Sequence, residues 1–402
     1  MAAKKAGKVR SGLDVMRAQK FRALKGKRVG LLVHAASVDR TLAHTLDLMR
    51  DAGVNLVRLF GPEHGIHATA QDMDHVRGSV DARTGLKVVS LYGSTYESLR
   101  PSGDELKDLD VMVLDLQDIG TRFYTFAYTV AFCMHACGRA GVPVVVLDRP
   151  NPIGGLLVEG NTVDVATLQS FVGEYPLAVR HGLTMGELCH LLNGPLLPRG
   201  EVKADLTVVW MEGWKRRMAF GDTGLPWVLP SPNMPTPDTA LVYPGGCLYE
   251  GTNLSEGRGT TRPFELVGAP YLDPYHFAEA LTAEKLPGVT FRPLYFQPTF
   301  HKWAKQVCGG VQIHVTDREV FPSFLAGLLV LKHARAQAGG AFEWRKEVYE
   351  FVGDRLAIDL LLGRVGLRPL LEGQASKKDL TASWKADLAG FQRVRRGVLH
   401  YA

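Results

Sequence analysis

The sequence predicts an α/β protein built on a parallel sheet, and three observations support this prediction. Short apolar segments alternate with helical segments at intervals typical of βαβ units. The run that begins at residue 111 is aliphatic and ends abruptly in polar residues, which is typical of a strand buried on both faces of a parallel sheet. The chain has 402 residues, 46% of them hydrophobic, which is enough for a large core and two to three domains.

The first half of the chain contains the predicted sheet. The strands are expected at 28–33, 55–60, 87–92, 111–116, 142–147 and 206–211. The helices are expected at 41–52, 126–140 and 184–192. In the last of these, Thr184 and Glu187 have the spacing of a capping box. Parallel strands joined by helices imply right-handed crossovers.

The second half has a different pattern. Residues 223–265 are rich in proline, glycine and asparagine and have little periodicity, which indicates a long functional loop. From about residue 270 the pattern changes to that of an α+β unit. We expect helices at 277–286, 321–336 and around 379–395, and a strand at 310–315. We therefore divide the chain into a larger unit, 12–265, and a smaller one, 266–402.

Charge and cysteine content exclude several classes of protein. The net charge is +6 and the only basic cluster is a short tail, so we expect no nucleic-acid partner. No apolar stretch approaches the roughly 20 residues that span a bilayer, and no secretory signal is present. The five cysteines have no paired CxxC spacing, which favours a reducing compartment without structural zinc. We expect a soluble cytoplasmic protein, or an extracytoplasmic one if a leader was removed. Its oligomeric state cannot be inferred.

Polar residues gather at the ends of four predicted strands. Taken singly, each cluster is what an ordinary turn contains. Because the carboxyl ends of parallel strands share one edge of a sheet, the four together predict a single cleft. The clusters consist of His34 and Ser37; Glu63 and His64; Asp115, Gln117, Asp118, Arg122 and Tyr124; and Asp148, Arg149 and Asn151.

Known cofactor motifs are absent from the sequence. The first strand is followed by HAASVDR, not by a glycine-rich dinucleotide turn, and there is no GxxxxGK[ST], GxSxG or HExxH. The histidines lack ligand spacing, so we expect neither a metal nor a cofactor. The remaining candidates for chemistry are the carboxylates. Glycosidases use two such groups, one on each side of the scissile bond. Asn, Gln, Thr, Tyr and Arg in the same cleft suit sugar hydroxyls, and Trp227 and Tyr243 are candidates for stacking.

An ordered series of motifs resembles a known family. The series is GPEHG (61–65), DLQDIGTRFYT (115–125), LDRPNPIGG (147–155), PSPNMPT (230–236), YPGGCLYEGTNLSEGRGTTRPFE (243–265) and CGGVQIHVTD (308–317). It closely resembles the exo-acting β-N-acetylmuramidases of peptidoglycan recycling, from about Gly12 to the C-terminus. The resemblance implies a Rossmann-like N-terminal domain, a smaller C-terminal domain and an active-site cleft between them. It also implies release of N-acetylmuramic acid from the non-reducing end of cell-wall fragments without metal or nucleotide.

The resemblance also implies a set of site residues. The matched positions are Glu63, His64, Asp115, Gln117, Asp118, Arg122, Tyr124, Asp148, Arg149, Asn151, Asn233, Glu250, Asn253, Glu256 and Arg258. We predict that Glu63 is the general acid, because desolvation at a buried strand end favours a protonated carboxyl.

Several residues are candidates for the second catalytic carboxylate and for the arginine that binds the substrate. Glu256 and Asp118 lead for the second carboxylate, with Asp115, Asp148 and Glu250 as structural alternatives. Arg122, Arg149 and Arg258 are candidates to hold the lactyl carboxylate bidentately. We expect at least one of these arginines to form an internal ion pair instead.

Two other functions fit the sequence. One is an esterase or amidase that acts on similar fragments with Ser37 or Cys247 as nucleophile, although no nucleophile elbow is present. The other is a muropeptide-binding protein without catalysis. The two classes differ in whether product is released.

Overall fold

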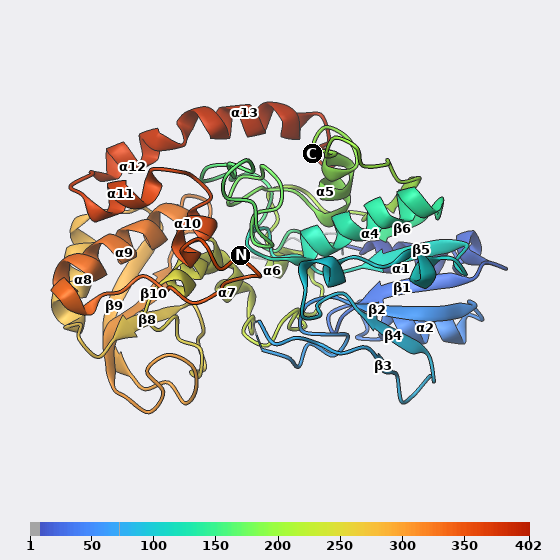
Figure 1. Cartoon of the computed structure of the whole chain (residues 1–402), viewed down its shortest axis with the longest axis horizontal. Coiled ribbons are helices and arrows are strands. Elements are labelled where there is room, and N and C mark those ends of the chain that lie inside the picture. The colour runs from blue at the N-terminus through green and yellow to red at the C-terminus, as the bar shows by residue number, and fades with distance from the viewer. Residues whose placement is uncertain (1–8, 72) are drawn as a thin grey trace, which may run out of the picture.

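The chain folds around two sheets, which belong to a larger and a smaller unit (Figure 1). This computed structural model describes residues 9–71 and 73–402. The larger sheet has seven strands in the order β3-β4-β2-β1-β5-β6-β7. The strands are β1 (Val29–Val33), β2 (Leu56–Gly61), β3 (Ser79–Val80), β4 (Lys87–Ser90), β5 (Val111–Asp115), β6 (Val144–Leu147) and β7 (Leu206–Val209). All neighbouring pairs are parallel except β3 with β4, so the predicted α/β class is confirmed.

The sheet is buried on both faces, as the aliphatic runs predict. Leu31 and Val113 pack on one side with α1 (Gly12–Ala18) and α2 (Thr45–Asp51). The other side packs against α4 (Phe126–Ala140) and α5 (Met185–Leu192). Every residue of β1, β5 and β6 is buried. Successive side chains of a strand face opposite sides, so a strand covered on both sides is apolar throughout.

The strand order reverses between β1 and β5, which brings the polar turns to one edge. The chain runs outward from β1 through β2 to β4 on one side, and from β5 through β6 to β7 on the other. The carboxyl edge at such a point is where open α/β sheets bind ligands. The turns after β1 and β5 meet there: the backbone N–H of Gln117 donates to Nε2 of His34 at 3.0 Å.

The smaller unit has an antiparallel sheet in the order β8-β10-β9. Its strands are β8 (Leu266–Ala269), β9 (Val289–Phe296) and β10 (Cys308–Val315). The helices α8 (Pro274–Ala283) and α9 (Ser323–Ala338) pack beside it. β10 and α9 were predicted, whereas β8 and β9 were not. Seven of the eight residues of β9 are exposed or half-buried, so the strand shows no regular alternation of buried and exposed residues.

The prediction that 223–265 has little regular structure is wrong for its middle part. α7 (Pro237–Gly246) and the 3₁₀ helix η3 (Cys247–Gly251) lie within it. Pro237 begins α7 favourably, but Pro244 and two terminal glycines conceal the helix in the sequence. The glycines serve a close crossing with α9. A Cβ on Gly245 would lie 2.1 Å from the carbonyl oxygen of Ser323, and one on Gly327 would lie 2.4 Å from that of Gly245. The division after residue 265 stays a prediction.

The C-terminal segment returns to the larger unit. α10 (Ala357–Leu362), α11 (Leu367–Glu372) and α12 (Lys377–Ser383) lie on the side of the smaller unit, and α13 (Lys385–Arg396) runs from them toward α5 (Figure 1). The single helix predicted around 379–395 is therefore two helices, separated at Trp384. Arg395 anchors the crossing, because its guanidinium donates to the carbonyls of His181, Gly155 and Gly182.

The remaining helices are short. They are α3 (Gly103–Leu106), α6 (Phe220–Thr223), η1 (Arg22–Leu24), η2 (Tyr96–Leu99) and η4 (Gly339–Ala341). Within 9–71 and 73–402, no helix is both long and apolar enough to cross a membrane.

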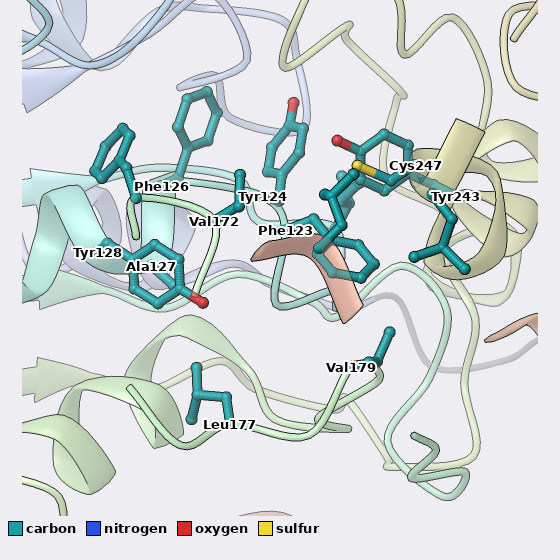
Figure 2. Close-up of a cluster of buried hydrophobic side chains, with 14 of the residues drawn as sticks. Phe123, Tyr124, Phe126, Ala127, Tyr128, Val172, Leu177, Val179, Tyr243 and Cys247 are labelled. Atoms are coloured by element: carbon teal, nitrogen blue, oxygen red, sulfur yellow. The ribbon is translucent and has the colours of Figure 1, made fainter. Parts of the chain in front are cut away.

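An aromatic core supports the carboxyl edge of β5. Figure 2 shows Tyr124 and Phe126 side by side, with Tyr243 and Cys247 of the α7–η3 segment next to them. The rings of Tyr124 and Phe126 lie 4.7 Å apart in a T-shaped arrangement, and Tyr124 meets Tyr243 in the same manner at 6.0 Å. Edge-to-face contacts of this kind fix ring orientation. The turn after β5 is thereby held rigidly against α7.

Candidate active site

A cavity opens between the carboxyl edge of the large sheet, the α7–η3 segment and the smaller unit. The centre of a water-sized sphere can occupy about 40 Å³ of it. The larger unit contributes Glu63, His64, Tyr124 and Thr125 to its wall. From the other side come Asn233, Glu250, Arg258, Tyr349 and Glu350. Sequence segments far apart thus form one polar hollow floored by aromatic rings.

Glu63 lies at the end of β2 in a rigid setting. Pro62 precedes it, and its side chain is buried with 6% exposed. The Oγ1 hydroxyl of Thr125 donates to Oε2 of Glu63 at 2.6 Å. The next residue, His64, has φ +67°, a left-handed conformation that non-glycine residues rarely adopt. The Nδ1–H of His64 donates to the carbonyl of Ala70 at 2.8 Å, which holds this strained turn in place.

Tyr124 connects Glu63 with Asp118. Burial raises the pKa of the Tyr124 hydroxyl well above its usual value, and the nearby carboxylates of Asp118 and Glu63 raise it further. Asp118 is buried; its Oδ2 accepts the N–H of Gly120 at 2.7 Å and lies 3.4 Å from Nε2 of His181. Its Oδ1 has no hydrogen-bond partner within the described part of the chain. Asp118 is not among the described residues that line the cavity.

Glu250 is the carboxylate that faces the cavity from the α7–η3 segment. Its Oε1 accepts from Nη2 of Arg258 at 2.7 Å, and its Oε2 accepts from the hydroxyl of Tyr349 at 2.6 Å. Both donors stabilise negative charge on this carboxylate. Glu350 lies beside them and accepts from the hydroxyl of Tyr92 at 3.1 Å. The cavity therefore contains carboxyl groups in different environments, as acid–base chemistry requires.

Glu256 lies behind this wall, in an ion cluster. Nζ of Lys302 lies 3.0 Å from it, Nδ1 of His301 3.2 Å and Nε of Arg258 3.1 Å. Burial by itself would raise the pKa of Glu256, but the charges of Lys302 and Arg258 and the hydrogen bond with His301 outweigh burial and lower this pKa well below its usual value. Glu256 is fully buried and is not among the described residues that line the cavity. Glu256 therefore has a structural role: its ion pair holds the side chain of Arg258 in position.

Asp115 and Arg149, both predicted for the site, are paired with each other. Nε and Nη2 of Arg149 donate to the two carboxylate oxygens of Asp115, and Nη1 donates to the carbonyl of Val38. The Thr45 hydroxyl donates to Oδ2 of Asp115 as well. Arg149 and Gln117 line a separate small pocket at the β1–β5 reversal, and neither of them lines the cavity around Glu63. The expectation that at least one arginine forms an internal ion pair is confirmed by Arg258 with Glu256, whereas Arg149 pairs with Asp115 and not with Asp148.

Asp148 ties the sheet to the C-terminus. It accepts from the N–H of Gly186 at 2.7 Å, from Thr184 at 3.1 Å and from the hydroxyl of Tyr401. Burial raises its pKa to about 7, against the opposing effect of the hydrogen bonds from Tyr401, Gly186 and Thr184. The predicted capping box of α5 is present and lies beside Asp148: Thr184 accepts from the N–H of Glu187.

Arg122 joins the two units. Its Nη1 donates to the carbonyls of Asn161 and Leu177, and its Nη2 donates to those of Leu361 and Leu362 in α10. The side chain is fully buried, and burial lowers its pKa to about 10. Its guanidinium is bound by backbone oxygens instead of facing the cavity.

Three predicted amide side chains also make internal hydrogen bonds. Gln117 donates to the carbonyl of Pro150 at 2.9 Å, and Asn151 donates to that of Leu183 at 3.0 Å. Asn253 donates to the carbonyl of Ala341 at 2.9 Å and lies in a different cavity. The predicted residues that the structure does bring together are Glu63, His64, Tyr124, Asn233, Glu250 and Arg258.

Neither candidate nucleophile of the esterase alternative is suited to attack. Ser37 is fully buried and its hydroxyl donates to the carbonyl of Asp115. Cys247 is buried in the aromatic core of Figure 2, and burial raises the pKa of its thiol well above the usual value. Nucleophilic cysteines need the opposite, a lowered pKa. The geometry therefore disfavours this alternative.

The sequence reasoning missed several residues in the wall. Thr125 lies inside the motif 115–125, and its place directly before an apolar helical run could have marked it. Ser231 lies inside the motif 230–236. Tyr349 and Glu350 belong to no motif, although Glu350 has φ +46° and the following Phe351 has φ +67°. Backbone conformation of this kind is not visible in a sequence.

The arrangement of possible metal ligands among the described residues differs from that of a metal-binding site. In the ranges 9–71 and 73–402, no group of three or more His, Cys, Asp or Glu side chains is arranged to hold an ion. The chemistry available to the described side chains is proton transfer and charge stabilisation by carboxylates, hydroxyls and a guanidinium.

Comparisons with known proteins agree with this architecture. The family model for the N-terminal domain of exo-β-N-acetylmuramidase NamZ matches residues 29–238, and the model for its C-terminal domain matches residues 241–401. The peptidoglycan β-N-acetylmuramidase NamZ of Bacillus subtilis (strain 168) is 43% identical over 395 residues, which cover 98% of this chain and 92% of that protein.

Two solved structures of DUF1343 family proteins from Bacteroides fragilis NCTC 9343 have the same fold. One is 34% identical with a TM-score of 0.87, and the other is 29% identical with a TM-score of 0.77. In each case the match covers 98% of this chain and 99% of the other. The resemblance inferred from the motifs is confirmed: the chain belongs to the exo-β-N-acetylmuramidase NamZ family.

Proposed function

We propose that this protein is an exo-acting glycoside hydrolase that releases N-acetylmuramic acid from the non-reducing end of peptidoglycan fragments. The observation that carries the proposal is the position of Glu63 in the cavity wall, buried and hydrogen-bonded to Thr125, opposite the charge-stabilised Glu250. Two carboxyl groups in contrasting environments allow one to donate a proton while the other stays ionised. Family membership supports the same activity.

We assign the general-acid role to Glu63, as the sequence suggests. For the second carboxylate we favour Glu250 over Glu256 and Asp118. Glu250 lines the same cavity as Glu63, whereas the other two are not among the described residues that line it. Hydrogen bonds from Arg258 and Tyr349 hold its carboxyl group in place, which suits a group that activates water or stabilises an oxocarbenium-like transition state.

Arg258 is our candidate for the lactyl carboxylate of muramic acid. It lines the cavity, whereas the guanidinium groups of Arg122 and Arg149 are bound to carbonyls and to Asp115. Its charge is shared with Glu250 and Glu256, so we expect it to orient the substrate by a hydrogen bond rather than by net attraction.

The test compares two leaving groups. Glu63→Gln is expected to slow release of muramic acid from muramyl-N-acetylglucosamine about a hundredfold to ten-thousandfold, the range typical of a lost general acid. The loss should be much smaller with a p-nitrophenyl muramide, because nitrophenolate leaves without a proton. Glu250→Gln should slow both substrates alike. Equal losses on both substrates for Glu63→Gln would show that Glu63 is not the acid.

We propose a cytoplasmic location. Cys133, Cys137, Cys189, Cys247 and Cys308 are all buried and unpaired. Free buried thiols suit a reducing compartment, where they do not meet oxidants. Fractionation of cells that express the full-length protein, with detection by antibody, tests this proposal directly.

A further inference from the structure

A second cavity lies next to the catalytic one. The centre of a water-sized sphere can occupy about 490 Å³ of it. Residues 252–253, 301–303 and 343–347 form its walls, the second of these from the β9–β10 connection. We call it the tryptophan groove, because the half-buried rings of Trp303 and Trp344 line it.

One layer of side chains separates the two cavities. The guanidinium of Arg345 in the groove lies 5.2 Å from the ring centre of Tyr349, which lines the catalytic cavity. Glu256 contacts Arg258 of the catalytic wall on one side and Lys302 of the groove on the other. The two cavities are therefore neighbours on either side of these side chains.

Both tryptophan rings are held in fixed orientations. Nε1 of Trp303 donates to the carbonyl of Asn253, and Nε1 of Trp344 donates to Oε1 of Glu372 at 2.8 Å. With their polar edges bonded to protein, the rings expose apolar surface to the groove. Indole surfaces of this kind contribute favourable stacking on the C–H faces of sugar rings.

The segment that presents Trp303 is strained. His301, Trp303 and Lys305 have φ values of +69°, +57° and +64°. A bulky residue in this left-handed region is uncommon and persists where the surroundings enforce it, often at ligand sites. Hydrogen bonds within the segment hold it: the N–H of Lys305 donates to the carbonyl of Pro298 at 2.8 Å, and the N–H of Gln306 donates to that of Trp303 at 3.0 Å.

The charges of the groove are balanced. Nζ of Lys302 is bound to two carbonyls and a carboxylate, and Nε of Arg345 lies 3.8 Å from Glu347. Glu343 and Lys346 also line the groove, and their side chains carry opposite charges. A phosphate-rich or polyanionic ligand would need an excess of cations. Uncharged sugars, which bring hydroxyl and acetamido groups, fit this wall.

We propose that the tryptophan groove binds the sugar residues of the leaving glycan, on the reducing-end side of the bond that is cleaved. This inference rests on the glycosidase activity proposed above and specifies which part of its substrate the groove holds. N-acetylhexosamine rings stack on Trp344 and Trp303 while the terminal muramic acid occupies the catalytic cavity. Longer fragments are then better substrates than a single glycoside.

The kinetic test uses the ratio of kcat/KM for a muramyl-terminated tetrasaccharide to that for a p-nitrophenyl muramide. Any inactive fraction of enzyme cancels in this ratio. Trp344→Ala is expected to lower the ratio roughly threefold to tenfold, and Trp344→Phe to restore most of it. Trp210→Ala is the matched control: Trp210 is half-buried, stacks on His400 and lies outside the groove, so the ratio should not change. An unchanged ratio in Trp344→Ala would overturn the proposal.

A binding test separates the groove from the activity. Tri-N-acetylglucosamine, which has no muramic acid, should quench tryptophan fluorescence of the wild-type protein saturably and of Trp344→Ala weakly or not at all. Saturable quenching without hydrolysis of either substrate would support the groove and reject the glycosidase. Hydrolysis of both substrates without any quenching by the trisaccharide would reject the groove alone.

Discussion

The hydroxyl of Thr125 donates a hydrogen bond of 2.6 Å to Oε2 of Glu63, and thereby joins the first residue before α4 to the turn after β2. The two residues are adjacent in space because β2 and β5 lie on either side of β1 and end at the same edge. This bond fixes the orientation of the carboxyl group toward the cavity. Five predictions, including that for Glu63→Gln above, follow from such contacts.

Removing the Thr125 hydroxyl should impair catalysis more than stability. Thr125→Val keeps the shape of the side chain, but leaves Glu63 without its positioning donor, and a lost bond to a carboxyl group is worth about 1–3 kcal/mol. We expect kcat to fall about tenfold to a hundredfold with KM little changed, measured on muramyl-N-acetylglucosamine. Thr129→Val is the matched control. Thr129 lies one turn further into α4, and its hydroxyl donates to the backbone carbonyl of Thr125 and not to a carboxyl group. Equal losses in both variants would contradict the positioning role.

Tyr349→Phe tests whether the smaller unit completes the active site. The Tyr349 hydroxyl donates to Glu250 at 2.6 Å, so its removal should disturb the charged carboxylate and lower kcat about tenfold. Tyr128→Phe loses a bond of the same length, from the Tyr128 hydroxyl to the carbonyl of Arg122 beneath the site. That control should show a lower melting temperature with kcat retained. If Tyr349→Phe turns over substrate at the wild-type rate, catalysis does not depend on the hydrogen bond from Tyr349 to Glu250.

Glu256→Gln should destabilise the protein in a pH-dependent manner. The ion cluster depresses the pKa of Glu256 in the folded state below its ordinary value of 4.5. Its contribution to stability is therefore fully present above about pH 4.5 and decreases as pH falls toward the folded-state pKa. Urea unfolding should show a loss of about 3 kcal/mol at pH 7 and a smaller loss at pH 4. Glu212→Gln, at an exposed ion pair with Arg10, should change little at either pH. If the loss of unfolding free energy is larger at pH 4 than at pH 7, the pKa of Glu256 is not lowered in the folded state.

Arg122→Met should weaken the junction between the two units. The substitution fills much of the same volume but leaves the carbonyls of Asn161, Leu177, Leu361 and Leu362 without their donor. Buried acceptors left unpaired cost about 1–3 kcal/mol each before relaxation, so we expect the free energy of unfolding to fall by at least about 3 kcal/mol. Chemical denaturation with fluorescence detection measures this. A variant with wild-type stability and impaired substrate binding would instead support the substrate-contacting role that the sequence suggested for Arg122.

The sheet could be predicted because its determinants are local. The strands β1, β2, β4, β5, β6 and β7 coincide closely with aliphatic runs, and α4 and α5 with helical periodicity. α2 begins at Thr45, later than the predicted 41, because Leu42 has φ +66° and ends any helical turn before it. α7 was missed because it is almost completely buried and so has no polar face to reveal its period.

The site could be predicted in part. Glu63, Tyr124 and Glu250 belong to conspicuous motifs, and the structure brings them together. The same motifs contain Asp115 and Arg149, which bind each other. A carboxylate that binds substrate and one that binds an arginine look alike in a sequence, because the difference lies in what is within about 3 Å in space.

By itself, the sequence determined the alternation of strands and helices, the polar character of the sheet's carboxyl edge and the relationship to the muramidase family. These depend on residue type and spacing along the chain. The tertiary structure decided which acids face the cavity, that Glu256 is neutralised by Lys302, His301 and Arg258, and that Tyr349 reaches Glu250 from the smaller unit. Ion pairing and burial depend on distances between segments that the chain order does not specify.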